Sequence, residues 1–417
     1  MPDTPGPARR KRTKVQLDVN LNAELTGFCS AAAPTGAHHR LVKSYASPLF
    51  FGPPRSEALI ELVTHLYTEH EAEVAQHLLP WRPRTAEKIA KLTAMSLGEV
   101  RRTLEHLTAT KQIVVRFGDP ARYTILPVIP GTFEMTLMRL DQASFNTWHR
   151  DFAHKFKRVW SSGYITRYMP LLPAPIRFIP VARAAPTLHI AWPADRLEEI
   201  LDRYSLFAIG DCQCRIATRL TGEGCDRPTH NCVGIGPIAQ LVLDRGLMRR
   251  ADRQEVLEAK KNAEAHGCVT WLANEFGDPH GTVSCSCCGC CCHALRAINQ
   301  FSAPGFISRP HFMPRRDAAR CTVCGRCSAI CPVGAWKKIG AQIYFETVRC
   351  VGCGLCVTAC KTNALALQPV SAAPVPERSW LSLVGKSAPS FLTNVFKVWL
   401  GRMLATAPKA PHTDAAR

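Results

Sequence analysis

Two stretches of the sequence repeat one cysteine pattern. Residues 321–331 and residues 350–360 each contain four cysteines in the spacing C-x2-C-x2-C-x3-C, and the offset between the runs, from 321 to 350, is 29 residues. Ala335 and Ala364 keep this offset. Because the thiolate form of cysteine binds soft metals and metal clusters, the repeat predicts two related metal sites.

The spacing suits a cubane of four iron atoms. Three thiolates separated by two residues can surround one corner of a [4Fe–4S] cluster, because tight turns at Gly325, Gly352 and Gly354 would point the sulfurs inward. The fourth cysteine starts a segment that leads away, and in a two-cluster arrangement it ligates the other cluster. Zinc is the alternative, but it usually takes paired C-x2-C units, which these runs fit badly. The expected ligand sets are Cys321, Cys324, Cys327 and Cys360 for one cluster, and Cys350, Cys353, Cys356 and Cys331 for the other.

On these two runs, residues 312–370 closely resemble the bacterial two-cluster ferredoxins. The resemblance implies a small domain with two [4Fe–4S] clusters that transfers electrons. The sequence departs from the family pattern at one place, since Pro332 follows the last cysteine of the first run but Lys361 follows that of the second. A positive charge there should raise the potential of the nearby cluster.

Eleven further cysteines lie in the middle of the sequence, where their spacing is irregular. An apolar stretch over residues 206–209 predicts a buried strand that ends at Cys212 and Cys214. These two cysteines, with Cys225 and Cys232, form one candidate ligand set.

The run at residues 285–292 reads Cys-Ser-Cys-Cys-Gly-Cys-Cys-Cys, and neighbouring side chains diverge too much for all six cysteines to ligate one metal. A helix is expected after this run, and its N-terminal dipole would stabilise nearby thiolates. Cys268 could complete either set. The candidate ligands of the middle region are Cys212, Cys214, Cys225, Cys232, Cys268, Cys285, Cys287, Cys288, Cys290, Cys291 and Cys292.

We expect at least one further iron–sulfur cluster among these cysteines, with a zinc site or buried inert thiols as alternatives. The Cys-Cys-Gly element resembles the cysteine-rich motif of heterodisulfide-reductase-type subunits, but it lacks their long spaced pattern, so their catalysis is not implied. The whole layout resembles multi-cluster iron–sulfur proteins of ferredoxin type. No nearby histidine is assigned as a ligand.

Composition and charge limit the function further. The 417 residues carry 52 Lys and Arg against 33 Asp and Glu, and the net charge of +19 favours acidic partners. No apolar run is long enough to span a membrane, and no signal peptide follows the basic N-terminus, so a cytoplasmic location is expected. Disulfides are disfavoured there, and Cys29 remains outside every cysteine group.

The N-terminal half predicts a winged-helix-like domain. Helices are expected at 57–68, near 71–79, from Thr85 and from Ser96, followed by a hairpin at 113–126. The fourth helix would expose basic residues to DNA, but we favour a protein-docking module because a run of base-reading side chains is missing. The basic residues in question are Arg101, Arg102, His106 and Lys111.

The sequence therefore predicts an α+β protein with a winged-helix-like helical domain, an α/β cysteine-rich domain and a two-cluster ferredoxin-like domain. The expected function is single-electron transfer to a redox partner protein, as a component of an oxidoreductase system. A redox-sensing DNA-binding regulator and an oxidoreductase subunit with a substrate-facing cluster are the alternatives, and no catalytic residue is assigned. An amphipathic helix over 390–405 suits peripheral membrane contact, a partner groove or packing on its own core. The expected divisions are a basic flexible tail (1–50), the winged-helix-like domain (51–130), the cysteine-rich domain (131–310), the ferredoxin domain (311–370), and a linker with the amphipathic helix (371–417).

Overall fold

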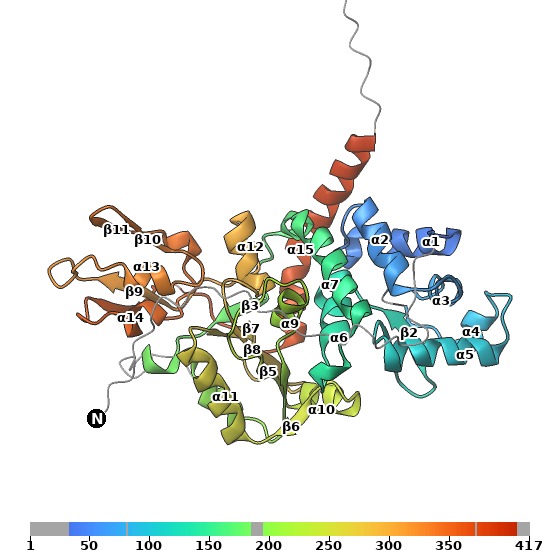
Figure 1. The fold of residues 1–417 in the computed structure, drawn as a ribbon, viewed down its shortest axis with the longest axis horizontal. Coiled ribbons are helices and arrows are strands. Elements are labelled where there is room, and N and C mark those ends of the chain that lie inside the picture. The colour runs from blue at the N-terminus through green and yellow to red at the C-terminus, as the bar shows by residue number, and fades with distance from the viewer. Residues whose placement is uncertain (1–32, 81, 185–194, 372, 407–417) are drawn as a thin grey trace, which may run out of the picture.

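The computed structural model describes residues 33–80, 82–184, 195–371 and 373–406. Helices from the N-terminal third lie at one end of the long axis, and the segment with the two cysteine runs lies at the other (Figure 1). A six-stranded sheet with its own helices lies between them. The mixed helix and sheet agree with the α+β class. Cys29 lies outside the described residues.

Two of the N-terminal helices begin at the capping residues that the sequence indicated, and the helix expected near 71–79 lies at residues 69–75. Thr85 and Ser96 each accept a backbone hydrogen bond, and Glu99 completes a capping box with Ser96. A two-stranded antiparallel hairpin follows the helices, as expected. The elements are α1 (Gly36–Tyr45), α2 (Glu57–Leu66), α3 (Glu69–Ala75), α4 (Ala86–Ala90), α5 (Leu97–Glu105), β1 (Val114–Phe117) and β2 (Arg122–Ile125).

Two expectations about this region need correction. Residues 36–50, assigned to the flexible tail, form α1 and a short turn, because α1 buries Leu41 and Tyr45 in the helical core. Lys111 does not extend a basic face. Its side chain is buried, and its Nζ lies 2.5 Å from Glu71 Oε2.

The helical core continues past residue 131, where we expected a new domain to begin. It includes α6 (Phe133–Leu137) and α7 (Thr147–Ser161). The aromatic face of α7 is buried and packs against α2. The end of the N-terminal helical domain therefore lies after the expected residue 130, because the apolar face of α7 packs on the N-terminal helices.

The central sheet is antiparallel at every strand pair, so this domain is not of the α/β class that we expected. Side chains of successive residues face opposite sides, and β4 sends Ile209 toward α11 and Ala208 toward α10. The strands lie in the order β3 (Ile176–Phe178), β7 (Val269–Ala273), β8 (Thr282–Cys287), β5 (His230–Ile235), β4 (Phe207–Asp211) and β6 (Arg249–Ala251). The helices are α8 (Leu197–Leu201), α9 (Gln213–Leu220), α10 (Pro237–Asp244), α11 (Arg253–Ala265) and α12 (His293–Phe301).

The C-terminal cysteine segment shows the sequence repeat in its backbone. Each cysteine run turns at a glycine with positive φ, Gly325 at 79° and Gly354 at 76°, and a short helix follows directly. These two helices contact each other. The segment consists of β9 (Phe312–Arg316), α13 (Arg326–Ile330), β10 (Trp336–Ile339), β11 (Gln342–Phe345), α14 (Leu355–Thr358) and β12 (Leu365–Pro369), with β9 paired to β12 and β10 to β11.

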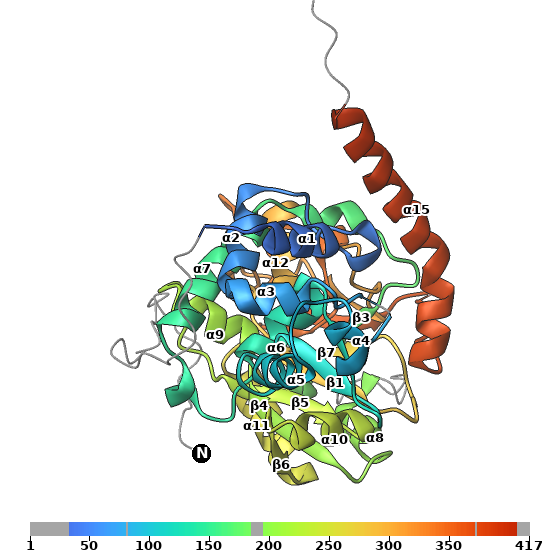
Figure 2. The same cartoon turned by 90° about the vertical axis from the view of Figure 1, so that its right-hand side faces the viewer.

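The last helix, α15 (Trp380–Thr406), begins ten residues before the predicted start at Ser390 and continues through Pro389. It runs along the side of the molecule, and its C-terminal part projects beyond the body (Figure 2). Asn394 and Arg402 fix it to the helical core by donating to backbone carbonyls. None of the helices in the described part of the chain combines the length and apolar character needed to cross a membrane.

Candidate metal centres

The first cysteine group of the C-terminal segment draws on both runs. Cys321, Cys324 and Cys327 line one pocket together with Cys360, which belongs to the second run. Cys324 is exposed and the other three are partly buried. We call these four residues the outer set. The structure thus brings together the four residues expected to ligate one cluster.

The second group, which we call the inner set, consists of Cys331, Cys350, Cys353 and Cys356. Burial raises the pKa of Cys350 to about 11 and that of Cys356 to about 12, and the nearby Cys331 thiol adds to both shifts. Cys353 and Cys356 are buried, whereas the outer set includes an exposed thiol. Such buried thiols would lose their protons on binding a metal, since the thiolate is the ligand.

Backbone N–H groups are directed at several of these sulfurs. Ala335 donates to Cys331 Sγ at 3.2 Å, and Ala364 donates to Cys360 Sγ at 3.3 Å. The repeated alanines of the sequence therefore occupy equivalent positions, each four residues after the last cysteine of its run. Hydrogen bonds to cluster sulfurs are one of the means by which a protein sets a cluster potential.

The central domain forms a much tighter group, the compact tetrathiol, from Cys225, Cys288, Cys290 and Cys291. Four of its Sγ–Sγ distances are 3.9 Å (225–288), 3.7 Å (225–291), 3.4 Å (288–290) and 3.7 Å (290–291). In the part of the chain that the structure describes, no other group of three or more cysteine, histidine or acidic ligand atoms is packed so closely.

This grouping corrects the set that we expected from the sequence. Of Cys212, Cys214, Cys225 and Cys232, only Cys225 joins the compact tetrathiol. Cys232 instead pairs with Cys285, at 3.6 Å between the sulfurs. The expected set fails because the chain between these cysteines turns through α9 and into β5, which separates residues that are close in sequence.

A second central group, which we call the extended thiol group, contains Cys212, Cys214, Cys287 and Cys292. Side-chain contacts run from Cys212 to Cys214, from Cys214 to Cys292 and from Cys292 to Cys287. Cys212 and Cys292 are the residues immediately before α9 and α12, where a helix dipole favours a thiolate. Neighbouring thiols and burial outweigh this effect and raise the pKa of both cysteines well above the usual value. The helix expected after the dense cysteine run is thus present.

Two arginines, one buried and one partly buried, accompany these cysteines and were not expected from the sequence. Arg215 is fully buried, and its guanidinium donates to Cys268 Sγ at 3.4 Å and to Cys288 Sγ at 3.5 Å. Arg227 donates to Cys290 Sγ at 3.6 Å. Both arginines follow a cysteine within two residues, which is the signal that could have revealed them.

The positive charge of these arginines lowers the pKa of nearby thiols, whereas burial raises it. Contacts from the neighbouring thiols of Cys225, Cys290 and Cys291, together with the charge of Arg215, hold the pKa of Cys288 well below its usual value. Cys268 lies outside the tetrathiol, and burial raises its pKa to about 12.

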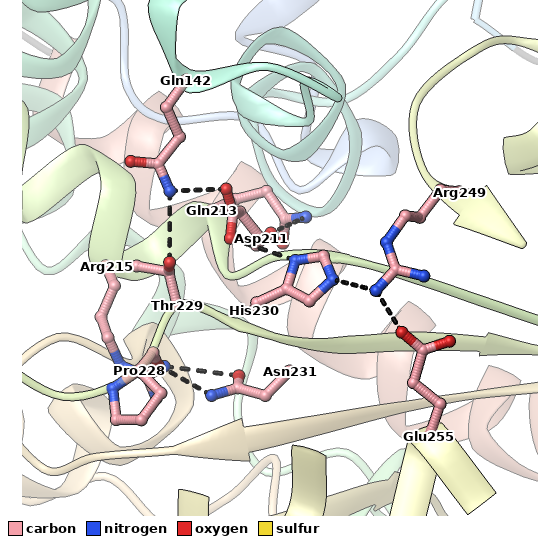
Figure 3. A network of polar contacts seen from close by, with 10 residues as sticks. All are labelled: Gln142, Asp211, Gln213, Arg215, Pro228, Thr229, His230, Asn231, Arg249 and Glu255. Atoms are coloured by element: carbon pink, nitrogen blue, oxygen red, sulfur yellow. Dashed lines mark hydrogen bonds and ion pairs between the residues drawn. The ribbon is translucent and has the colours of Figure 1, made fainter. Parts of the chain in front are cut away.

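A polar network holds the strand ends that carry several of these residues (Figure 3). Gln142, between α6 and α7, donates to Asp211 Oδ2 at 2.7 Å and to Thr229 Oγ1 at 3.2 Å. Arg215 donates to the Pro228 carbonyl and to Asn231 Oδ1. The network therefore ties the end of β4 and the start of β5 to the N-terminal helices.

His293 contacts a cysteine, but its buried surroundings keep the imidazole uncharged. Its Nδ1 lies 3.2 Å from Cys214 Sγ, and its ring packs edge-on against Phe133, Phe156 and Trp160. Burial lowers the pKa of His293 to about 3, so the imidazole is neutral at physiological pH.

The central and C-terminal cysteine regions touch through their loops. A Cβ on Gly289, between Cys288 and Cys290, would overlap the carbonyl oxygen of Pro332, which follows Cys331. Asn299 Nδ2 donates to both the Gly289 carbonyl, at 3.0 Å, and the Pro332 carbonyl, at 2.9 Å. The compact tetrathiol and the inner set are therefore neighbours.

Comparison with known proteins identifies one part of this chain. Residues 313–361, which contain both cysteine runs, match the family model described as a 4Fe-4S dicluster domain. Neither curated proteins nor solved structures give a match to the chain. Together with the cysteine arrangement, the match supports iron–sulfur cluster binding.

Proposed function

We propose that this chain is an iron–sulfur electron-transfer protein whose outer and inner sets each hold one [4Fe–4S] cluster. The observation that carries the proposal is the pocket lined by Cys321, Cys324 and Cys327 of one run and by Cys360 of the other. Two isolated single-run sites would not bring Cys360 to this pocket. The matched dicluster family model supports the same conclusion.

The residues around each set suit different tasks. A cluster of this type takes up and releases single electrons. The exposed Cys324 places the outer set where a partner protein can approach, whereas burial of Cys353 and Cys356 excludes water from the inner set. The backbone N–H groups of Ala335 and Ala364 stabilise the sulfur charge at both.

The net charge of +19 supports an acidic redox partner, since complementary charge speeds encounter. The proposed role is that of an electron-carrying component of a cytoplasmic oxidoreductase system. Peripheral membrane contact through 390–405 is a further part of the proposal. It is supported by exposed apolar side chains on α15, such as Phe396, Trp399 and Leu404.

The proposal also includes a further iron–sulfur cluster in the central domain, at the extended thiol group. Its four cysteines come from three separate places, the start of α9 (Cys212 and Cys214), the end of β8 and the residue before α12. This arrangement supports a cluster site because it brings four thiols from separate elements into one chain of contacts.

The basic residues on and after α5, which suggested DNA binding, do not support that function in the structure. Lys111 is buried against Glu71, and Arg101 lies 2.7 Å from Glu87. Fewer cations thus remain for phosphate contacts than the sequence suggested. We therefore do not propose a redox-sensing regulator.

Anaerobic iron and sulfide analysis with EPR tests the proposal on the full chain. We expect at least about eight iron atoms, four for each C-terminal cubane, and about twelve with the central cluster. Reduction should give signals of [4Fe–4S] clusters. A C-terminal segment that carries zinc and no acid-labile sulfide would overturn the proposal.

A further inference from the structure

We propose that the compact tetrathiol, Cys225, Cys288, Cys290 and Cys291, binds a single tetrahedral Zn²⁺ ion. The proposal goes beyond electron transfer, because zinc does not change its oxidation state in proteins. It assigns a closed structural site to four cysteines for which the sequence left iron–sulfur, zinc and inert thiols open.

The distances between the sulfurs carry the assignment. A Zn–S bond of about 2.3 Å places the ligands of a regular tetrahedron about 3.8 Å apart. Four of the six sulfur–sulfur distances in the compact tetrathiol run from 3.4 to 3.9 Å, and all six are within 4.8 Å. The four sulfurs therefore surround a space that fits one ion.

A cubane would need wider spacing, because it binds each thiolate through a different iron atom. The outer set, the inner set and the extended thiol group all have wider spacing, since in none of them do three described sulfurs lie within 4.8 Å of one another. The same protein thus contains two kinds of four-cysteine site, which differ in the size of the metal group they fit.

Charge balance supports a bound ion over inert thiols. Arg215 is fully buried, and its polar contacts are to two sulfurs, the Asn231 amide oxygen, and the carbonyls of Pro228 and Ser286. A buried cation among neutral groups is costly. Four thiolates on Zn²⁺ leave two negative charges, and Arg215 and Arg227 supply two positive ones. The filled site is then neutral overall.

The position of the ion gives it a structural role. Cys288 and Cys290 flank Gly289, whose carbonyl is joined to that of Pro332 through Asn299. An ion bound by both cysteines fixes the loop on which the inner set rests. All four coordination positions are taken by protein, as in structural zinc sites.

Metal analysis of the full chain purified without chelator tests the assignment. We expect about one zinc per chain beside the cluster iron, as a closed four-cysteine site holds one ion. Cys225→Ser and Cys291→Ser should each lose the zinc and keep the iron of the C-terminal clusters. Cys232→Ser is the control. Cys232 lies outside the compact tetrathiol, so this variant should retain both the zinc and the cluster iron. Zinc that persists in both test variants would overturn the site.

Cobalt substitution gives a second measurement that does not depend on the variants folding. Co²⁺ bound in place of zinc should show the intense visible and thiolate charge-transfer absorption of a tetrahedral tetrathiolate. Wild-type protein with no zinc and extra iron at this site would refute the assignment. Iron content and EPR report separately on the proposed electron-transfer function, so each idea can fail without the other.

Discussion

The compact tetrathiol and the outer set each contain four cysteines, yet they are built in different ways. The outer set takes three of its residues from one short loop, Cys321–Cys327, and lines a pocket. The compact tetrathiol takes three from the dense run and one, Cys225, from a loop 63 residues before Cys288, with its sulfurs in contact. The comparison teaches that cysteine density does not indicate the size of a metal group. The separation of the sulfurs does.

The largest expected effect concerns the crossed ligand sets. Cys360→Ser should disturb the cluster of the outer set, although Cys360 belongs to the run that supplies most of the inner set. We expect a loss of up to about four iron atoms and of one EPR signal. Cys331→Ser is the matched control and should disturb the inner cluster instead. Loss of the same signal in both variants would contradict the crossed arrangement.

The next effect tests the charge around the compact tetrathiol. Arg215→Met should lower the free energy of unfolding by about 3–5 kcal/mol, because it leaves buried negative charge without its partner. Arg215→Lys keeps the charge but loses the planar set of donors, so its loss should be smaller. Denaturant unfolding under anaerobic conditions measures both. Equal stability of Arg215→Met and wild type would show that these sulfurs carry no net charge.

A smaller effect tests the contact between the two regions. Gly289→Ala places a methyl group against the Pro332 carbonyl and should cost about 1–3 kcal/mol, as overpacking does. Gly401→Ala in α15 is the control, since no atom lies within 4 Å of its added Cβ. Thermal unfolding measures the difference. An unchanged midpoint for Gly289→Ala would mean that the two loops do not touch in solution.

The smallest effect is pH-dependent and lies where the C-terminal segment meets the central domain. Burial lowers the pKa of His311, but the hydrogen bond and charge of Asp195 outweigh it, so the pKa is raised. The protonated pair therefore adds stability below the ordinary histidine pKa, which is lost as pH rises through the raised value. Asp195→Asn keeps a hydrogen-bond acceptor but loses the charge, so it should cost on the order of 1 kcal/mol near pH 5 and less near pH 9, where the imidazole is neutral. A larger loss at pH 9 would contradict this sign.

The sequence predicted the C-terminal segment best, because a local spacing determines it. Cys321, Cys324 and Cys327 lie on one loop, so their proximity follows from the motif alone. The capped helices at Thr85 and Ser96 were predictable for the same reason. The winged-helix-like character of that region and its role in protein docking stay predictions.

The central cysteines were not predictable in this way, since tertiary structure decides which of them meet. Cys225 joins Cys291 only because α9, β5 and β8 fold together, and no local pattern encodes that contact. The antiparallel order of the sheet could not be predicted either, because strand pairing also depends on tertiary structure. The arginines beside the sulfurs could have been suspected because Arg215 follows Cys214 directly and Arg227 follows Cys225 by two residues.

The contact of Gly289 with Pro332 has a consequence for how the chain can diversify. The C-terminal cysteine segment is tied to the central domain, because Asn299 bridges the two loops and Arg349 donates to the carbonyls of Ile298 and Val333. Any segment inserted in its place would have to reproduce these partners. The two cysteine regions are thus expected to be inherited together, and a hybrid that replaces one must redesign the other.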